Sequence, residues 1–461
     1  MEAFNLFKKS KVLLGSLSAV SVLMLAACGG GDSSTESGGS LTSGDSTGNK
    51  ELTFMFRGGE DEKKAYEAAI SAFEDANPGV NVNVISTDAD QYATKLQASI
   101  AGNDIPDVFY VEQGDVMAYV DNGILKDITE EVEHSDFDVE NIWQYGIDSY
   151  RYDGKNIGQG NIYGLPKDVG PFALGYNKTM FEEAGIALPD VDTPYTFEEF
   201  IEVGKQLTKD KDGDGELDQW ATGFNVNWSL HAFVWSNGGD YLNEDYSQVT
   251  IDSPEFIEAL QFFADIQNVH GLTPSVAQAQ TLDTYQRWMN GEIAFFPVGP
   301  WDMSTYATLD FEYDLLPWPA GKTGVPATYI GSLGIGVSET TEHEDEAIEL
   351  AMYLSTSEEG QQQLVDAQIQ IPNLIDMADE WASDTESLPN NKKEFVDIVA
   401  DYGRALPAAR TYTSEWYDEF FINIQPVLDG EQTAKDYVKQ VQPRMQELLD
   451  ASIIQHEQSA N

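Results

Sequence analysis

The segment that decides the fold is residues 52–111, LTFMFRGGEDEKKAYEAAISAFEDANPGVNVNVISTDADQYATKLQASIAGNDIPDVFYV. Short apolar runs alternate in it with stretches whose apolar residues recur every three or four positions, as on one face of a helix. Asn-Pro-Gly at 77–79 ends the first of these stretches, and the valines that follow alternate with polar residues. The pattern predicts strands at 52–56, 80–84 and 107–111 and helices at 61–76 and 91–101.

This β-α-β-α-β order predicts an α/β fold, with a largely parallel sheet and helices on both of its faces. The rest of the chain continues in the same style. Thr196 and Glu199 form a capping box, and Ser253-Pro254 is a typical helix start. We expect a strand at 292–296 that Pro297 ends, helices at 346–354 and 358–367, and a last helix at 433–449 that Pro443 kinks or divides.

Composition excludes one class of partner. The chain has 461 residues, which suggests two to three domains, and 41% of them are hydrophobic, enough for a large core. Acidic residues outnumber basic ones 79 to 25, for a net charge of -54. Because such a surface repels phosphate backbones, we expect no nucleic-acid partner, and the mutual repulsion favours a monomer.

The N-terminal residues have the layout of a secretory signal peptide at 1–27, with three lysines before an apolar run. The run ends in LAAC at 25–28, which resembles a bacterial lipobox and implies that Cys28 carries a lipid anchor. Residues 28–49 are rich in Gly and Ser and predict a flexible linker. The alternative is a single membrane-spanning helix with an incidental cysteine. Cys28 is the only cysteine, so an intramolecular disulfide is excluded.

Catalytic motifs are not found in the sequence. It contains no G-x-S-x-G, H-E-x-x-H or P-loop, and its five histidines have no metal-ligand spacing. Carboxylate pairs, which a glycosidase needs, arise by chance in so acidic a chain. We therefore expect neither a catalytic residue nor a required cofactor.

One stretch, DKDGDGELD at 210–218, has the pattern of a calcium-binding loop. Carboxylates recur at alternate positions, and Gly215 permits the sharp turn. Ala221 stands where an EF-hand has its bidentate glutamate. The alternative is a solvated acidic turn. The candidate ligands of a structural calcium ion are Asp210, Asp212, Asp214, Glu216 and Asp218.

The stretch GLPKDVGPFALGYNK at 164–178, followed by MFEEAG at 180–185, resembles the signature of extracellular solute-binding protein family 1. This family comprises sugar receptors of bacterial ABC importers and includes the maltose-binding proteins. Further matches follow in the family's order: IPDVF at 105–109, NGIL at 122–125, NGG at 237–239, GPW at 299–301 and IGS at 330–332. The resemblance extends from about residue 51 to residue 450 and includes the lipobox.

The resemblance implies two α/β lobes with the ligand in the cleft between them. The chain would cross between the lobes near 168–171, 329–333 and 368–373. The N-terminal lobe would then hold residues 51–169 and 333–370, and the C-terminal lobe residues 172–330 and 373–461. Interfaces between lobes are also where small-molecule sites are expected on physical grounds.

A sugar receptor needs aromatic rings that stack on the C–H face of a pyranose. Trp301 follows Gly299-Pro300 past a predicted strand end and is the first candidate, with a core position as the alternative. By resemblance, Trp228 matches an aromatic contact position and Trp416 or Tyr417 the late aromatic wall. Trp235 fits a pocket or the core equally well.

Polar candidates come from strand ends and crossovers. The carboxyl ends of strands in open α/β sheets are where ligand groups gather, and the crossovers adjoin the expected cleft. A merely structural role is the alternative for each of these residues. The candidates are Glu112, Gln113 and Asp115 after the third strand, Arg57 after the first, and Asp168, Gly331 and Ser332 at crossovers.

These features predict an extracytoplasmic, lipid-anchored receptor that captures a sugar or oligosaccharide and delivers it to an ABC permease. Two alternatives remain open: an extracellular glycoside hydrolase, and a binding lipoprotein for a non-sugar solute. The chain has only six arginines, which disfavours a phosphorylated ligand.

Overall fold

The computed structural model describes residues 49–135 and 137–459. The predicted signal peptide, the lipid-anchor residue Cys28 and nearly all of the linker lie outside the described residues. In the described part, no helix is long and apolar enough to cross a membrane.

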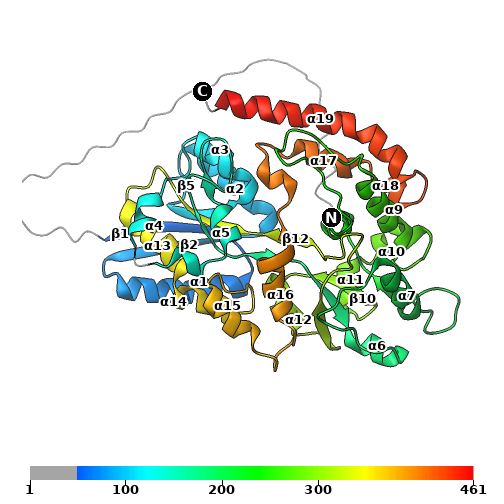
Figure 1. Cartoon of the computed structure of the whole chain (residues 1–461). Helices are drawn as coiled ribbons and strands as arrows, with labels where there is room; N and C mark the ends of the chain where they lie inside the picture. The colour runs from blue at the N-terminus through cyan, green and yellow to red at the C-terminus, as the bar shows by residue number, and fades with distance from the viewer. Residues whose placement is uncertain (1–48, 136, 460–461) are drawn as a thin grey trace, which may run out of the picture. The chain divides into compact units, whose positions relative to one another are not determined.

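The N-terminal sheet has the strand order β2-β1-β3-β13-β6. β1 pairs in parallel with β2 and β3, as predicted, whereas β13 runs antiparallel to both β3 and β6. Apolar residues on both faces of the sheet and on the covering helices form the lobe's core. Its strands are β1 (Lys50–Arg57), β2 (Val80–Thr87), β3 (Val108–Glu112), β6 (Leu165–Pro166) and β13 (Leu333–Val337). Its helices are α1 (Glu60–Ala76), α2 (Ala89–Gly102), α3 (Val116–Asp121), α4 (Thr129–His134), α5 (Gln144–Asp148), α13 (Glu344–Thr356) and α14 (Glu358–Asp366), with short segments η1 (Gln113–Asp115), η2 (Val139–Asn141), β4 (Arg151–Tyr152) and β5 (Asn161–Ile162) (Figure 1).

The second sheet has the order β11-β8-β10-β9. The expectation of a mostly parallel sheet is wrong here, because β8 runs antiparallel to β10 and β11, and only β9 and β10 are parallel. Ala173 at the start of β8 pairs with Val298 at the end of β10, so the two strands run in opposite directions. The strands are β8 (Ala173–Asn177), β9 (Trp220–Thr222), β10 (Ile293–Val298) and β11 (Tyr313–Leu316).

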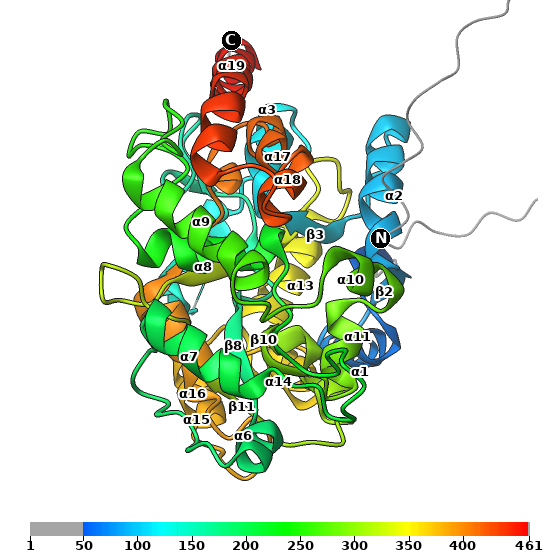
Figure 2. The same cartoon turned by 90° about the vertical axis from the view of Figure 1, so that its right-hand side faces the viewer.

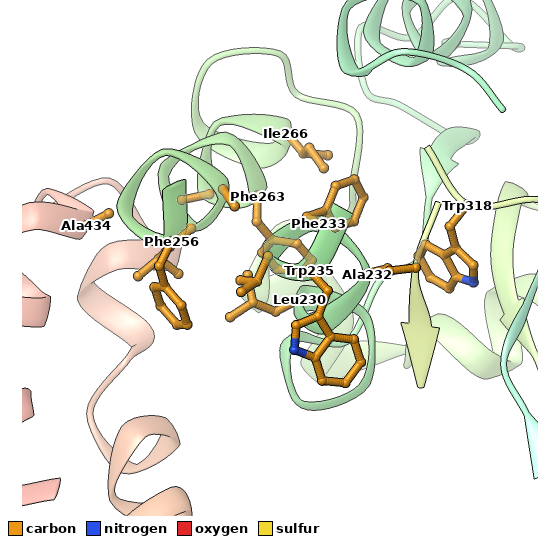
Figure 3. Close-up of a cluster of buried hydrophobic side chains, with 14 of the residues drawn as sticks. Leu230, Ala232, Phe233, Trp235, Phe256, Phe263, Ile266, Trp318 and Ala434 are labelled. Carbon is orange, nitrogen blue, oxygen red and sulfur yellow. The ribbon is translucent and has the colours of Figure 1, made fainter. Parts of the chain in front are cut away.

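The helices of the C-terminal lobe lie around the second sheet (Figure 2). Their apolar side chains pack mainly in two hydrophobic clusters, and Figure 3 shows part of the larger one. α7 opens with the predicted capping box, and Ser253 caps α9. They are α6 (Lys178–Ala184), α7 (Phe197–Leu207), α8 (Val226–Ser236), α9 (Pro254–Asn268), α10 (Val276–Thr281), α11 (Thr284–Met289), η3 (Pro300–Asp302), α12 (Met303–Tyr306), α15 (Ile375–Ala382), α16 (Lys393–Asp397), η4 (Ile398–Tyr402), η5 (Pro407–Arg410), α17 (Glu415–Ile422), α18 (Gln425–Leu428) and α19 (Ala434–Ser459).

Two prolines do not have the effect that the sequence predicts. Pro297 lies inside β10, where β9 has already ended opposite Phe295, so its missing N–H costs no ladder hydrogen bond on that side. Pro443 lies inside α19 without dividing it. Because Pro443 is exposed, the carbonyl that it leaves unpaired can bind water.

Three short strands join the lobes: β7 (Gly170–Pro171), β12 (Thr328–Gly331) and β14 (Gly403–Arg404), in the order β14-β12-β7. The chain leaves the first sheet after β6, passes through β7 and enters the second sheet at β8. It returns from β11 through β12 to β13. The first passage contains β7 and the second contains β12.

The last helix, α19, belongs to both lobes. Tyr437, Val438 and Met445 are buried in the C-terminal core, whereas the far end contacts the N-terminal lobe. There the ring of His456 lies 2.7 Å from the Tyr152 hydroxyl, through Nε2. The Ser459 hydroxyl donates to the carboxylate of Asp121 at 2.9 Å, so the helix spans the two lobes.

Candidate binding cleft

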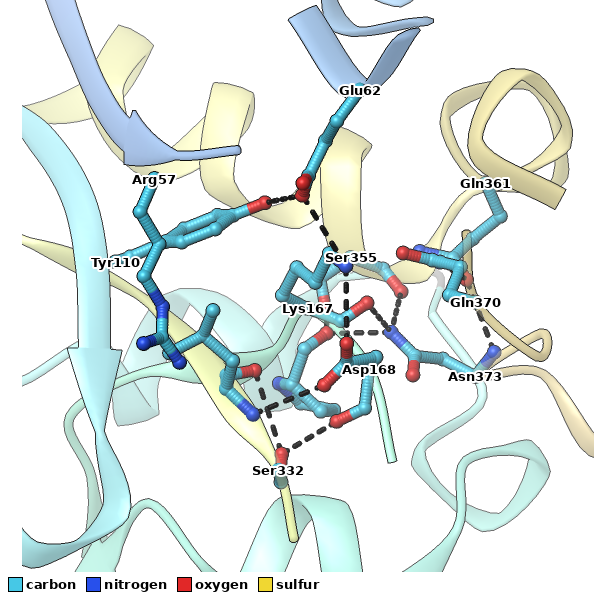
Figure 4. A network of polar contacts seen from close by, with 12 residues as sticks. Arg57, Glu62, Tyr110, Lys167, Asp168, Ser332, Ser355, Gln361, Gln370 and Asn373 are labelled. Carbon is cyan, nitrogen blue, oxygen red and sulfur yellow. Dashed lines mark hydrogen bonds and ion pairs between the residues drawn. The ribbon is translucent and has the colours of Figure 1, made fainter. Parts of the chain in front are cut away.

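A buried polar network ties the first two crossovers together (Figure 4). The Lys167 ammonium lies 3.4 Å from the Glu62 carboxylate and 3.0 Å from that of Asp168. The other Asp168 oxygen accepts from the amide of Leu333 at 3.1 Å, and the Ser332 hydroxyl donates to the Asp168 carbonyl at 2.6 Å. Burial lowers the pKa of Lys167, but the carboxylates of Asp168 and Glu62 outweigh it, so the pKa stands above its ordinary value.

Residues 370–373, which the resemblance assigns to a third crossover, are fastened to the first crossover by buried amides. The Asn373 side chain donates to the carbonyls of Pro166 at 2.6 Å and Lys167 at 3.0 Å. The Gln361 side-chain oxygen accepts from the Gln370 side chain and the Asn373 amide, each at 3.0 Å. Hydrogen bonds therefore join residues 166–168, 332–333 and 370–373 at one place.

A cavity of 460 Å³ lies beside this network, within the size range of small-molecule sites. Residues from the N-terminal lobe, β12 and the segment that follows β14 contribute to it. We call it the cleft cavity. It is lined by Glu112, Gln113, Gly114, Asp115, Ala118, Trp228, Tyr329, Ser332, Leu406, Ala408, Ala409, Tyr412, Thr413, Ser414 and Glu415.

Aromatic rings form a continuous row from the cleft cavity to η3. Trp228 and Tyr329 lie 5.5 Å apart between ring centroids, and Phe172 lies 5.7 Å from Trp228 and 5.0 Å from Trp301. Trp228 is 42% and Trp301 38% exposed, unlike most tryptophans of a core. Trp228 lines the cleft cavity, whereas Trp301 lies at the end of the row outside its lining. Both present ring surface to solvent, which a sugar could cover.

The polar candidates divide into those that line the cleft cavity and those that serve the framework. Glu112, Gln113, Asp115 and Ser332 line the cavity. The Gln113 side-chain amide is held by the hydroxyls of Tyr145 at 2.9 Å and Ser149 at 2.6 Å.

The remaining candidates support those lining groups. The Arg57 guanidinium pairs with Glu112 at 2.9 Å, just outside the lining. Asp168 is occupied by Lys167 and Leu333, as described above. Gly331 lies against the Tyr329 hydroxyl, where a Cβ would come within 1.9 Å of the oxygen, so this position admits the tyrosine because it is glycine.

The structure does not bring the late aromatic pair to the cleft cavity. Trp416 is fully buried, and its indole donates to the Thr411 hydroxyl at 2.9 Å. Tyr417 is also buried, with its hydroxyl 2.9 Å from Nε2 of His231. Trp235, for which both roles were open, lies in the core under the Arg404 guanidinium (Figure 3).

Sequence reasoning missed Tyr329, Phe172 and Tyr412. Phe172 directly follows the crossover predicted at 168–171, and Tyr329 begins the one predicted at 329–333. An aromatic residue at a predicted crossover was therefore the available signal. Tyr412 stacks on His456 at 4.8 Å, with the ring planes 12° apart. It carried no signal because the lobe contact of α19 depends on the tertiary structure.

The acidic loop keeps only part of its predicted ligand set together. Carboxylate oxygens of Asp210, Asp212 and Asp218 lie within 4.8 Å of one another on the surface, a separation that one calcium ion can bridge. Asp214 and Glu216 are not part of this group. Asp210 also accepts from the amides of Gly213 and Gly215, at 2.6 and 2.9 Å.

Two carboxyl groups in the cleft cavity, those of Asp115 and Glu112, are destabilised as anions. Burial, and to a lesser degree the nearby Glu112, raises the pKa of Asp115 from 3.8 to about 6, although a hydrogen bond with Tyr119 opposes the shift. Burial also raises the pKa of Glu112, against the attraction of Arg57. Such perturbed groups are typical of functional sites.

The raised pKa of Asp115 predicts a pH-dependent stability. Below about pH 3 the group is mostly protonated in both states, so it contributes almost no difference. As the pH rises to about 6, ionisation favours the unfolded chain, and above that value the penalty is constant. Asp115→Asn should therefore raise the melting temperature at pH 7 and leave it nearly unchanged near pH 3, as measured by calorimetry. An equal increase at both pH values would contradict the assignment.

The chain is similar in sequence to known oligosaccharide-binding proteins. It is 30% identical over 217 residues to the arabinooligosaccharide-binding protein of Halalkalibacterium halodurans, covering 44% of this chain and 46% of that protein. It therefore spans about half the length of that relative. It is 26% identical over 362 residues to the galactooligosaccharide-binding protein of Bacillus subtilis, covering 76% of each.

The chain is also similar to solved structures of binding proteins. An ABC substrate-binding protein of Listeria monocytogenes in complex with cycloalternan superposes with a TM-score of 0.75 at 25% identity, covering 87% of this chain and 99% of that one. The sugar-binding protein MalE of Xanthomonas citri, at 22% identity, shares the fold with a TM-score of 0.73 over 89% of this chain and all of that one.

The family model described as bacterial extracellular solute-binding protein matches residues 58–361, well over half of the chain. The chain belongs to this family.

Proposed function

We propose that this protein is the extracytoplasmic receptor of an ABC importer and that it binds a sugar or oligosaccharide in the cleft cavity. The observation that carries the proposal is the cavity itself, in which exposed ring surface from Trp228 lies beside hydrogen-bonding groups such as Gln113 and Ser332. Relatives named for oligosaccharide binding support the same ligand class.

The proposed mechanism is capture by closure of the lobes. A ligand that contacts Trp228 on one lobe and Glu112–Asp115 on the other stabilises the arrangement in which both contacts are made. Delivery to the permease then follows from recognition of that arrangement. Neither step forms or breaks a covalent bond, and neither requires a cofactor.

The test is incubation of the protein with a mixture of neutral oligosaccharides, followed by mass spectrometry under native conditions. We expect one class of intact oligosaccharide to be retained. Shortened products in solution would support a glycoside hydrolase instead, since Glu112 and Asp115 place two carboxyl groups in one cavity. If no sugar is retained or cleaved, the ligand belongs to another class of solute.

We propose lipid anchoring at Cys28 on the outer face of the membrane, because the lipobox-like LAAC precedes the folded part. Cys28→Ser removes the only thiol that could carry the lipid. The variant should appear in the medium of cells that retain the parent protein in the membrane fraction. Membrane retention of the variant with its signal segment uncut would show a helical anchor.

We propose a structural calcium ion at the acidic loop, held by Asp210, Asp212 and Asp218, whose carboxylates converge. Millimolar calcium should raise the melting temperature, and Asp212→Ala should abolish the increase. Glu431→Gln, which removes an exposed acid elsewhere, should keep it. A melting temperature that does not respond to calcium leaves the loop as a solvated acidic turn.

A further inference from the structure

The charged residues that line the cleft cavity are all acidic: Glu112, Asp115 and Glu415. The other lining side chains are neutral. A ligand that enters this cavity therefore meets three carboxyl groups, and no lysine or arginine lines the cavity to balance them.

The cations beside the cavity lie outside its lining. Arg410 is next in sequence to the lining residue Ala409, and its guanidinium donates to the Ile157 carbonyl at 3.4 Å. Arg57 pairs with Glu112, and Lys167 is buried between Glu62 and Asp168. Among the described residues, no lysine or arginine forms an ion pair with Asp115 or Glu415. Two of the three lining carboxyl groups thus have no counter-ion from the protein.

The electrostatic repulsion between the lining carboxyl groups acts mainly on Asp115. It is partly buried beside a like-charged neighbour, Glu112, and both acids have raised pKa values. A negative group on a ligand would add to this repulsion, whereas a positive group would relieve it. The strongly negative chain, at -54, acts in the same direction over longer distances.

We propose that the cleft cavity selects oligosaccharides by charge, binding amino sugars with a free ammonium group more tightly than their neutral parents and rejecting uronic acids. The proposal rests on the sugar-receptor function proposed above. Asp115 and Glu415 are the groups that make the selection, and the neutral groups of Gln113 and Ser332 serve hydroxyls that all three sugar classes share.

The test compares oligosaccharides that differ in one group. Cello-oligosaccharides differ from chitosan oligosaccharides by an ammonium group at C2 and from β-1,4-linked oligoglucuronides by a carboxylate at C6, so the linkage and the anomeric configuration stay the same. We expect the ammonium form to bind about tenfold more tightly than the neutral form, and the carboxylate form to bind about tenfold more weakly than the neutral form. Titration calorimetry at low and high salt measures both, and salt should shrink the differences.

Two variants assign the effect to residues. Asp115→Asn should reduce the preference between charged and neutral forms several-fold, and so should Glu415→Gln, which changes an exposed side chain and preserves the fold. Glu431→Gln is the matched control, since it removes one charge outside the cavity, and it should keep the full preference. Thermal melts confirm that each variant is folded.

The outcomes separate the two proposals. If a neutral oligosaccharide binds and its charged counterpart binds equally well, charge selection is wrong while the receptor function stands. A preference that both cavity variants retain also overturns it. If no oligosaccharide of this series binds and none is retained from the neutral mixture, the proposed function itself fails.

Discussion

Replacing Lys167 with methionine is expected to lower the free energy of unfolding by about 3–5 kcal/mol. The lysine side chain is only 5% exposed and is the cation that separates the carboxylates of Glu62 and Asp168. Methionine fills a similar volume but leaves two poorly hydrated negative charges facing each other. Urea unfolding followed by circular dichroism measures the loss.

A control and a partial rescue make this result specific. Lys205→Met removes a lysine from an exposed pair with Glu202 and should cost less than about 1 kcal/mol. Adding Glu62→Gln to Lys167→Met removes one of the stranded charges and should recover part of the stability. If Lys167→Met costs no more than the control, the buried network does not stabilise the crossovers as described.

The second large effect is expected at Trp416. Trp416→Ala should cost about 3–5 kcal/mol of stability because it opens a cavity in the C-terminal core. The folded fraction should bind the retained oligosaccharide with nearly unchanged affinity, since Trp416 has no exposed surface. Thermal melts and calorimetric titration on the same sample measure both quantities.

The exposed tryptophans should behave in the opposite way. Trp301→Ala and Trp228→Ala remove ring surface that solvent already reaches, so the stability should change little. Stacking on an aromatic ring is worth about 1–3 kcal/mol in the analogous case of nucleic-acid bases, which corresponds to roughly 5- to 150-fold in affinity. A variant of either residue that melts far lower yet binds normally would place that tryptophan in the core.

The contrast between these tryptophans shows where sequence reasoning reaches its limit. Trp228 and Trp235 lie seven positions apart on α8 and so share one face, yet one is exposed and the other buried. The difference arises because Trp228 lies in the first turn, at the cleft cavity. Helical spacing alone predicts which face of a helix is buried, but it does not predict which turn of the helix lies at a cavity.

Trp416 was predictable from local spacing. Trp416, Tyr417 and Phe420 are the buried residues of α17, and their spacing is that of an inward-facing stripe. The resemblance to a family contact position pointed instead to the cleft. Here the helical period was the better guide, because it reports which face of α17 packs against α19.

The order of strands and helices in residues 52–111 followed from periodicity, because each element has one buried face that the pattern records. The antiparallel pairs of the second sheet could not be predicted in this way. The direction of β10 relative to β8 depends on where the crossover joins the sheet, and no local pattern encodes that point.

The end of α19 has a practical consequence for work with this protein. His456 and Ser459 contact the N-terminal lobe. A purification tag or a fluorescent reporter fused directly after them would therefore disturb a contact between the lobes. A signal from such a reporter would mix ligand binding with strain at the attachment point. A probe on Lys205, which lies on an exposed face of α7, reports from the same lobe without that disturbance.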